Sequence, residues 1–224
     1  MSLVNGTRNG CKDVFRAFLL ENATYDGFLE IPTIEYGIYS PEKLISFSKC
    51  ISSKDYSCWV HFYEDDASFE RIWNNPKKYL PILKKFEGVI SPDFSLYRDM
   101  PLIMQFWNIF RNRAIGRWLQ DNGIKVIPNI RFGDRRTYKC SCYGVSKNGT
   151  IAIGTHGCVK IKEEKRYLSE GLDYVINHLS PKVIIIYGTA PEDIFIQYKN
   201  KGIKILQFDS DIMKNQKVIN HGCR

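Results

Sequence analysis

Short apolar segments alternate with longer segments of helical periodicity from Ile31 onward, and this alternation constrains the fold more than any other feature. Seven segments are predicted to be strands: IPTIEYG, CWVHFYEDD, GVISPDFS, KVIPNIRFG, TIAIGTHGC, KVIIIYG and IKILQFDSD. Helical patterns occupy residues 41–51, 68–86, 101–123, 163–179 and 191–202. A strand that is followed by a helix and then by another strand favours parallel pairing through right-handed crossovers. The sequence therefore predicts an α/β fold built from parallel βα repeats.

Two architectures fit such repeats: a TIM-barrel-like fold, complete or with fewer than eight strands, and an open doubly wound sheet. Strands of an open sheet that is covered on both faces read as continuous apolar runs, and only KVIIIYG does so. In IPNIRFGD, Asn129 and Arg131 lie on the face opposite Ile130 and Phe132, because successive side chains of a strand alternate. In a barrel, aliphatic side chains face the outer helices, and the lumen becomes polar toward the carboxyl ends of the strands. We therefore expect a barrel-like or incomplete barrel fold, with the open sheet as the alternative.

The boundaries between segments allow further predictions. Pro76 is expected to divide the 68–86 pattern into two helices, because proline disrupts a helix interior. The connection over 134–149 is too short for a full crossover helix with loops and is expected to hold at most one short helical turn. Residues 12–22 predict an earlier helix that acts as a lid or plug. Without repeats or linkers, we expect a helical extension over 1–30, a single barrel-like domain over 31–212 and a polar tail over 213–224.

Charge and cysteine content indicate the environment and the kind of partner. Lys and Arg number 32 against 24 Asp and Glu, which gives a formal charge of +8 and favours an anionic partner such as a nucleotide or nucleic acid. No apolar run approaches the ~20 residues needed to cross a bilayer, and the polar opening MSLVNGTRNG does not resemble a signal peptide. Seven cysteines without the spacing of a small secreted domain favour a reducing compartment. We therefore expect a cytoplasmic protein with free thiols and no membrane association.

Candidate functional side chains follow the predicted strands, because ligands of parallel α/β folds bind at the carboxyl ends of the strands. Arginine and its polar neighbours could hold phosphate oxygens, and the predicted ligand-binding residues are Asn129, Arg131, Arg98, Arg135 and His61. Oxygen ligands suit a hard cation such as Mg²⁺, and the predicted metal ligands are Asp65, Asp93 and Asp209. The predicted catalytic residues are Asp93, Asp209 and His156, the last as general acid or base. A metal ion and arginines around a phosphate would suit phosphoryl transfer or phosphodiester hydrolysis.

Each of these residues also has a purely structural interpretation. Arg131 could pair with Asp93 or Asp209 simply to satisfy buried charge. Asp65 could cap the helix that begins near Ser68. Cysteines and a histidine recur as C-x-C and H-x-C at Cys140, Cys142, His156 and Cys158, but this pattern lacks the usual spacing of a zinc site.

The helical pattern over 101–123 interleaves arginines with aromatic residues. Arg111, Arg113 and Arg117 could hold phosphates while Trp107 and Phe110 stack on bases. Core packing explains the aromatic residues better because apolar residues recur there at helical spacing. The arginines are then expected on a solvated face or in ion pairs with acids of the EDD and YRD segments. Common nucleotide-binding and hydrolase motifs such as G-x-x-x-x-G-K, G-x-S-x-G and H-E-x-x-H do not occur in the sequence.

Several long segments resemble one uncharacterised family. FEGVISPDFSLYRDMP, QFWNIFRNRAIGRWLQ, IPNIRFGDRRTY and AIGTHGCVK are similar to the signature segments of the domain-of-unknown-function family 4417 of bacteria, archaea, phages and mobile elements. The resemblance runs from about Trp59 to Phe208, and KCSCYG over 139–144 departs from the family pattern, which expects more aromatic and acidic residues there. It implies a viral or mobile-element origin and therefore a host cytoplasm, but no activity.

The sequence supports three functional hypotheses. The first is a protein that binds a phosphate-bearing ligand, a nucleotide or nucleic acid, at the carboxyl-terminal mouth of a barrel, with a metal-assisted hydrolase or transferase as its enzymatic version. The second is a non-catalytic binder that sequesters a host nucleotide signal or docks on a host protein. The third is a DNA- or RNA-associating accessory factor that uses its basic surface.

Overall fold

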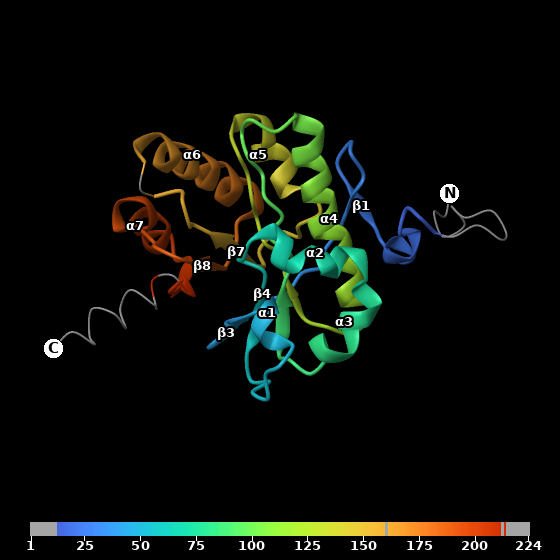
Figure 1. Cartoon of the computed structure of the whole chain (residues 1–224). Coiled ribbons are helices and arrows are strands. Elements are labelled where there is room, and N and C mark those ends of the chain that lie inside the picture. The colour runs from blue at the N-terminus through green and yellow to red at the C-terminus, as the bar shows by residue number, and fades with distance from the viewer. Residues whose placement is uncertain (1–12, 160, 212, 214–224) are drawn as a thin grey trace.

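Seven parallel strands and the helices between them form the body of the molecule (Figure 1). The computed structural model describes residues 13–159, 161–211 and 213. One sheet has the order β3 (Leu44–Ser46), β4 (Trp59–His61), β5 (Gly88–Ile90) and β6 (Val126–Ile127), and the other has the order β7 (Thr150–Gly154), β8 (Val183–Tyr187) and β9 (Lys204–Phe208). The longer helices are α2 (Asp66–Asn74), α3 (Pro76–Leu83), α4 (Leu102–Asp121), α5 (Arg135–Cys142), α6 (Lys162–Leu179) and α7 (Glu192–Asn200). The predicted α/β architecture with parallel strands is confirmed.

A single parallel bridge between Asn129 and Ala152 joins the two sheets. The Ile130 amide donates to the Ala152 carbonyl at 2.8 Å, and the Ala152 amide donates to the Pro128 carbonyl at 3.0 Å. The strand order therefore runs continuously from β3 to β9. Within the described residues, β3 pairs only with β4 and β9 pairs only with β8, so a closed barrel is not shown.

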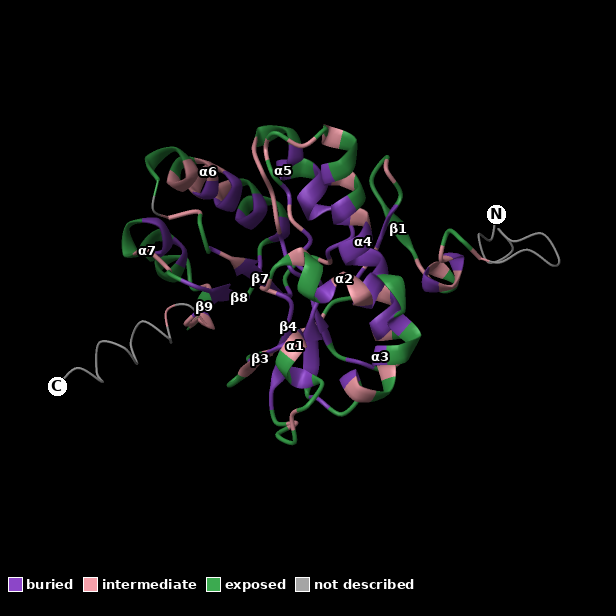
Figure 2. Ribbon diagram, viewed as in Figure 1, coloured by how far each residue is buried: buried purple, intermediate pink, exposed green. Residues whose placement is uncertain are grey.

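Three clusters of apolar side chains make up most of the core, which is coloured purple in Figure 2. One cluster packs α2, α3 and α4 against β4 to β6, and a second packs α6 and α7 against β7 and β8. The third cluster gathers side chains from the opposite face of every strand; its members include Leu44, Trp59, Ile90, Ile127, Ala152, Ile185, Leu206 and Phe208. Because Leu44 of β3 and Phe208 of β9 join the same cluster, the strands must curve around it.

Two boundary predictions can be judged at the start of the chain. The predicted strand over 31–37 is wrong: only β2 (Ile31–Pro32) forms there, and it pairs antiparallel with β1 (Tyr25–Asp26). The first parallel strand, β3, lies instead inside the predicted 41–51 helix, which is reduced to α1 (Phe47–Cys50).

The predicted break at Pro76 is confirmed, because α2 ends at Asn74 and α3 begins at Pro76.

Two connecting segments also differ from expectation. The connection after β6 holds the eight-residue helix α5, not the single short turn that was predicted. Asp134 caps this helix by accepting from the Arg136 amide at 3.0 Å, while the Thr137 hydroxyl accepts from the Asp134 amide. This reciprocal cap fixes the start of α5 at Arg135. The predicted helix over 12–22 contains only the 3₁₀ helix η2 (Ala17–Leu20) in its described part; residues 1–12 and 214–224 of the predicted extension and tail lie outside the described residues.

Helix α4 buries two of its arginines as well as Trp118, whose core packing was predicted. Arg113 is only 1% exposed, and Arg111 is also buried, whereas Trp107 is 47% exposed. Arg111 pairs with Glu70 at 2.6 Å and lies over the Phe94 ring. Arg113 donates to three backbone carbonyls, at 2.8 Å to Asn129, 2.7 Å to Ser141 and 3.1 Å to Tyr143. The expectation that these two arginines form a solvated face is therefore wrong, because their donors satisfy groups inside the fold.

Candidate functional site

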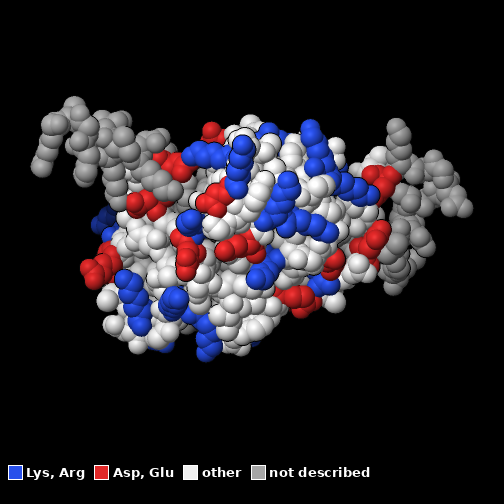
Figure 3. Space-filling view, turned by 90° about the horizontal axis from the view of Figure 1, so that it is seen from below, with Lys and Arg blue, Asp and Glu red and all other residues white. Residues whose placement is uncertain are grey.

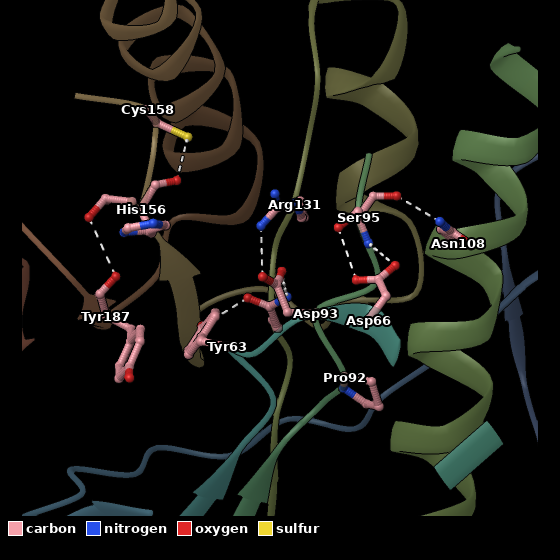
Figure 4. Close-up of polar contacts among 12 residues, drawn as sticks. Tyr63, Asp66, Pro92, Asp93, Ser95, Asn108, Arg131, His156, Cys158 and Tyr187 are labelled. Atoms are coloured by element: carbon pink, nitrogen blue, oxygen red, sulfur yellow. Dashed lines mark hydrogen bonds and ion pairs between the residues drawn. The ribbon is translucent and has the colours of Figure 1, made fainter. Parts of the chain in front are cut away.

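Two adjoining cavities open at the carboxyl ends of the parallel strands. Their volumes are about 540 and about 760 Å³, and Tyr97, Arg131, Gly154 and His156 contribute to the walls of both. Figure 4 shows the polar contacts around these walls. We call the two cavities together the mouth. The smaller cavity adds Tyr63, Asp65, Asp93 and Tyr187, and the larger adds Arg98, Asp134, Cys158 and Glu164.

A buried ion pair lies at the centre of the mouth. Arg131 Nη1 is 2.7 Å from Asp93 Oδ2, and Asn129 Nδ2 donates to the other carboxylate oxygen, Oδ1, also at 2.7 Å (Figure 4). The Asp93 side chain is 9% exposed, whereas the Arg131 side chain is 29% exposed. Burial raises the pKa of Asp93 above its ordinary value, although the guanidinium of Arg131 acts in the opposite direction. Asp93 therefore contacts the Arg131 guanidinium from the buried side, and the exposed part of Arg131 faces the mouth.

Asn129 connects this ion pair to the rest of the fold. Its amide oxygen accepts from the Tyr63 hydroxyl at 2.9 Å, and its backbone amide donates to the Ser91 hydroxyl at 2.8 Å. Its carbonyl accepts from Arg113. A strand residue with an amide side chain is needed here because Asn129 must donate to Asp93 and accept from Tyr63 at once. The amide and guanidinium of IPNIRFGD thus belong to one hydrogen-bonded network.

The segment that follows β5 is fastened to two helices. Asp66, the first residue of α2, accepts from the Ser95 amide at 3.1 Å and from its hydroxyl at 2.9 Å. Asn108 of α4 donates to the Ser95 carbonyl at 2.6 Å. These contacts fix the backbone just after Asp93, so the carboxylate is positioned by α2, α4 and β5 together.

Many carboxylates around the mouth already contact neighbouring groups. Glu64 accepts from the Ser48 amide at 3.0 Å, and Asp211 pairs with Lys49 at 2.5 Å. In the larger cavity, Arg98 pairs with Glu164 and also with Glu163, and its guanidinium lies 4.4 Å from the centre of the Tyr167 ring. These pairs reduce the negative field at the opening and leave Arg131 as the basic group shared by both cavities.

The structure brings together only some of the predicted site residues. Asp93, Asn129, Arg131 and His156 meet at the mouth, and Arg98 lines its larger cavity. Arg135 does not reach it, because its side chain is 79% exposed and pairs with Glu170 on the outside. Arg135 thus lines neither cavity, and its predicted ligand contact stays a prediction.

The other predicted residues have distinct surroundings. His61 is 2% exposed, its ring centre lies 4.4 Å from that of Tyr187, and its Nδ1 accepts from the Tyr63 amide at 3.2 Å. Asp65 lines the smaller cavity and is exposed, at the start of α2. Asp209 is partly exposed and, among the described residues, lines neither cavity. His61 therefore packs against Tyr63 and Tyr187, and its predicted ligand contact stays a prediction.

The donor set for a metal ion is not assembled. Among the residues that the structure describes, no three His, Cys, Asp or Glu side chains are grouped so that they could hold a metal ion. Asp65, Asp93 and Asp209 are therefore not brought together as a ligand set, and both oxygens of Asp93 accept from Asn129 and Arg131. Cys140 and Cys142 are buried in α5, where burial raises their thiol pKa values to about 11 and about 12.

Sequence reasoning missed the aromatic residues at the mouth. Tyr63 and Tyr187 stack with ring centres 4.7 Å apart and an interplanar angle of 12°. Burial raises the pKa of Tyr187 to about 12, and its hydroxyl accepts from the Asp211 amide at 3.1 Å. Tyr97, which is 60% exposed, contributes to both cavities. Tyr187 ends a continuous apolar strand, so its position at a strand terminus was the available signal.

Comparisons with known proteins identify relatives without an assigned activity. The chain is 29% identical to the Gene 1 protein of Mycobacterium phage D29 over 163 residues, which are 71% of this chain and 60% of that protein. It is 33% identical to the Gene 1 protein of Mycobacterium phage L5 over 129 residues, which are 58% of this chain and 56% of that protein. The chain thus spans somewhat more than half the length of these curated relatives. No solved structure matches the chain.

Among the described residues, no helix combines the length and the apolar character needed to span a bilayer.

The family model described as a domain of unknown function, DUF4417, matches residues 23–209. This match includes the segments that form the mouth and extends beyond the resemblance expected from Trp59 to Phe208. The chain belongs to the DUF4417 family.

Proposed function

We propose that this protein is an incomplete seven-stranded barrel that binds a phosphate-bearing ligand, a nucleotide or a nucleic acid, at its mouth. The continuous strand order from β3 to β9 and the shared inner cluster support the barrel. Cavities at the carboxyl ends of the strands have the location at which ligands bind in such folds. The proposal applies to this chain, which covers only part of its phage relatives.

The observation that carries the proposal is the way in which Arg131 is presented. Asp93 pairs with Nη1 of Arg131 on the buried side. The Arg131 side chain is 29% exposed and contributes to the walls of both cavities. A guanidinium fixed through one nitrogen loses less conformational freedom when its other donors bind phosphate oxygens. Proximity to Asp93 also raises the pKa of Arg131, so the donor stays cationic. Asp93 and Asn129 are therefore positioning residues for Arg131.

Aromatic side chains extend the same site toward a base or ribose. The exposed Tyr97 lies at the boundary between the two cavities, where a base could stack on its ring. His156 is exposed on the wall opposite the Asp93 loop and could donate to the same phosphate. A ligand with one phosphate and one flat ring would match these groups.

The geometry favours binding over catalysis. The predicted metal ligands are not grouped, and both oxygens of Asp93 already accept hydrogen bonds. We therefore place the non-catalytic binder, which sequesters a nucleotide in the host cytoplasm, ahead of the hydrolase or transferase. Loss of nucleotide with Mg²⁺ present, abolished by Asp93→Asn, would reverse this order.

Calorimetric titration with nucleoside mono-, di- and triphosphates and short oligonucleotides tests the proposal. Charge-assisted hydrogen bonds contribute about 1.5–3 kcal/mol, so Arg131→Gln should weaken binding by roughly 10- to 100-fold. Arg135→Gln is the matched control, because Arg135 also forms an ion pair but lies outside the mouth. Its affinity should equal that of the wild type. The proposal fails if no such ligand binds, or if both variants bind equally well.

A further inference from the structure

Lysines mark the amino ends of the parallel strands, at the opposite end of the molecule from the mouth. They precede or begin most strands; the six are Lys43, Lys84, Lys125, Lys147, Lys182 and Lys204. Lys43 directly precedes β3, Lys125 directly precedes β6, Lys182 directly precedes β8, and Lys204 begins β9. All six are exposed. We call this end of the molecule the lysine face.

Backbone hydrogen bonds place four of these lysines at the same end of the sheets. The Trp59 amide donates to the Lys43 carbonyl at 3.0 Å, and the Val89 amide donates to the Lys125 carbonyl at 2.9 Å. The Lys204 amide donates to the Lys182 carbonyl at 3.0 Å. Lys204 is the register partner of Val183, so the side chains of Lys182 and Lys204 point to opposite faces of the sheet. The lysines therefore share one end of the strands without forming a single row.

Few acids at this end pair with the lysines. The acids there include Glu35, Glu42, Asp55, Glu87 and Asp121. Asp55 pairs with Lys43 at 3.5 Å, whereas Glu35 and Asp121 pair with Arg117. Lys204 donates to the Ser40 hydroxyl at 3.2 Å. Among the described residues, Lys125 and Lys182 form no ion pair. Figure 3, seen from below, shows basic side chains spread across this part of the surface with acidic ones between them.

Charges at the mouth are more fully paired. Asp93 pairs with Arg131, and Asp211 pairs with Lys49. At the lysine face, Lys125 and Lys182 have no such partner among the described residues, so their charges remain available to a polyanion.

We propose that the lysine face binds the phosphate backbone of duplex nucleic acid without reading its sequence. Exposed ammonium groups on flexible stems suit phosphates whose positions vary, because each acts as a point charge. Side chains that read base edges need fixed geometry, which these exposed lysines do not have. The proposal is independent of the nucleotide site at the mouth, because the two lie at opposite ends of the strands.

The test measures binding of the full chain to a 30-base-pair DNA duplex by fluorescence anisotropy across a salt series. The variant is Lys125→Gln/Lys182→Gln/Lys204→Gln, which removes three charges from the face. Release of counterions predicts that the slope of log affinity against log salt becomes shallower by about 0.9 for each lysine that contacts a phosphate. The affinity at low salt should fall at least about tenfold.

The matched control is Lys49→Gln/Lys162→Gln/Lys165→Gln, which removes the same charge from segments that follow β3 and β7 at the mouth end. Its salt slope should remain that of the wild type, as should that of Arg131→Gln, so failure here is distinguishable from failure at the mouth. Equal losses in both triple variants would show that only net charge matters and would overturn the proposal. A duplex RNA of the same length should bind with a similar slope; binding of neither duplex would also overturn it.

Discussion

Arg131 reaches Asp93 across two adjacent strand ends, with Nη1 2.7 Å from Oδ2, and this pair joins the buried network to the open mouth. The carboxylate is almost fully buried, while the guanidinium keeps 29% of its side-chain surface exposed. The two partners therefore have different roles. Asp93 needs Arg131 to offset its burial, whereas Arg131 retains surface with which a ligand can interact.

Removal of Arg131 should destabilise the fold in a pH-dependent manner. Breaking a fully buried pair costs about 3–5 kcal/mol, and partial exposure of Arg131 reduces the expectation for Arg131→Gln to about 1–3 kcal/mol at pH 7. Burial raises the pKa of Asp93 above 3.8, so its protonated form favours folding below that value, and this contribution is lost as the pH rises through the folded pKa. Loss of Arg131 raises the pKa of Asp93 further, so this contribution to stability is lost over a wider range of pH.

Urea unfolding at pH 4 and pH 7 measures this effect. The difference in unfolding free energy between the wild type and Arg131→Gln should be smaller at pH 4, where Asp93 begins to be protonated. Arg135→Gln should show a small difference at both values, because its ion pair is exposed. A pH-independent penalty for Arg131→Gln would mean that Asp93 does not depend on this partner.

Periodicity in the sequence predicted the parallel strands from β4 onward, since each is an apolar segment between helical patterns. It failed for β3, because Leu44–Ser46 continues directly into α1, and the helical pattern of residues 41–51 includes both. The strand is defined by its pairing with β4. The length of helix α5 was underestimated. Its start is set by the reciprocal cap between Asp134 and Thr137, which was not recognised in the sequence.

The site was partly predictable because Asp93, Asn129 and Arg131 follow adjacent parallel strands, whose carboxyl ends must meet. Arg135 lies away from the mouth because it is the first residue of α5, and its side chain points outward to Glu170. Arg113 could not be predicted, since its partners are carbonyls 16 to 30 residues away in sequence. Its burial depends on tertiary contacts that leave no local pattern.

Arg113 should be among the most sensitive positions in the chain. Arg113→Met would leave the carbonyls of Asn129, Ser141 and Tyr143 without this donor inside the fold, and each unsatisfied group costs about 1–3 kcal/mol. We expect a loss of at least about 3 kcal/mol in unfolding free energy. Arg135→Met is the control, with an expected loss below about 1 kcal/mol, because the Arg135 side chain is exposed in its pair with Glu170. Equal losses, measured by urea unfolding, would contradict the structural role of Arg113.

Gly171 of α6 should be an exception to helix propensity. Alanine in place of glycine inside a helix normally stabilises by about 1 kcal/mol. A Cβ at Gly171 would lie 2.2 Å from Cε2 of Phe132, so Gly171→Ala should lower the melting temperature. Phe132→Leu should relieve the clash, and the double variant should lose less stability than the sum of the single variants. Additive losses would show that the two side chains do not meet.

Thiol labelling can report ligand binding at the mouth through Cys158. This thiol is partly exposed and lines the larger cavity, whereas Cys140 and Cys142 are buried. Burial raises all three thiol pKa values, so reaction with iodoacetamide should be slow at pH 8, and among these three it should be fastest at Cys158. Peptide mass spectrometry separates the sites.

A phosphate-bearing ligand bound to Arg131 should reduce the labelling rate of Cys158, because it covers the wall that the two residues share. Labelling of Cys140 should not change, since access to it requires opening of α5. In Arg131→Gln, the same ligand concentration should no longer protect Cys158, whereas in Arg135→Gln protection should persist. Protection that survives Arg131→Gln would place the ligand elsewhere and would separate the mouth from the proposed phosphate contact.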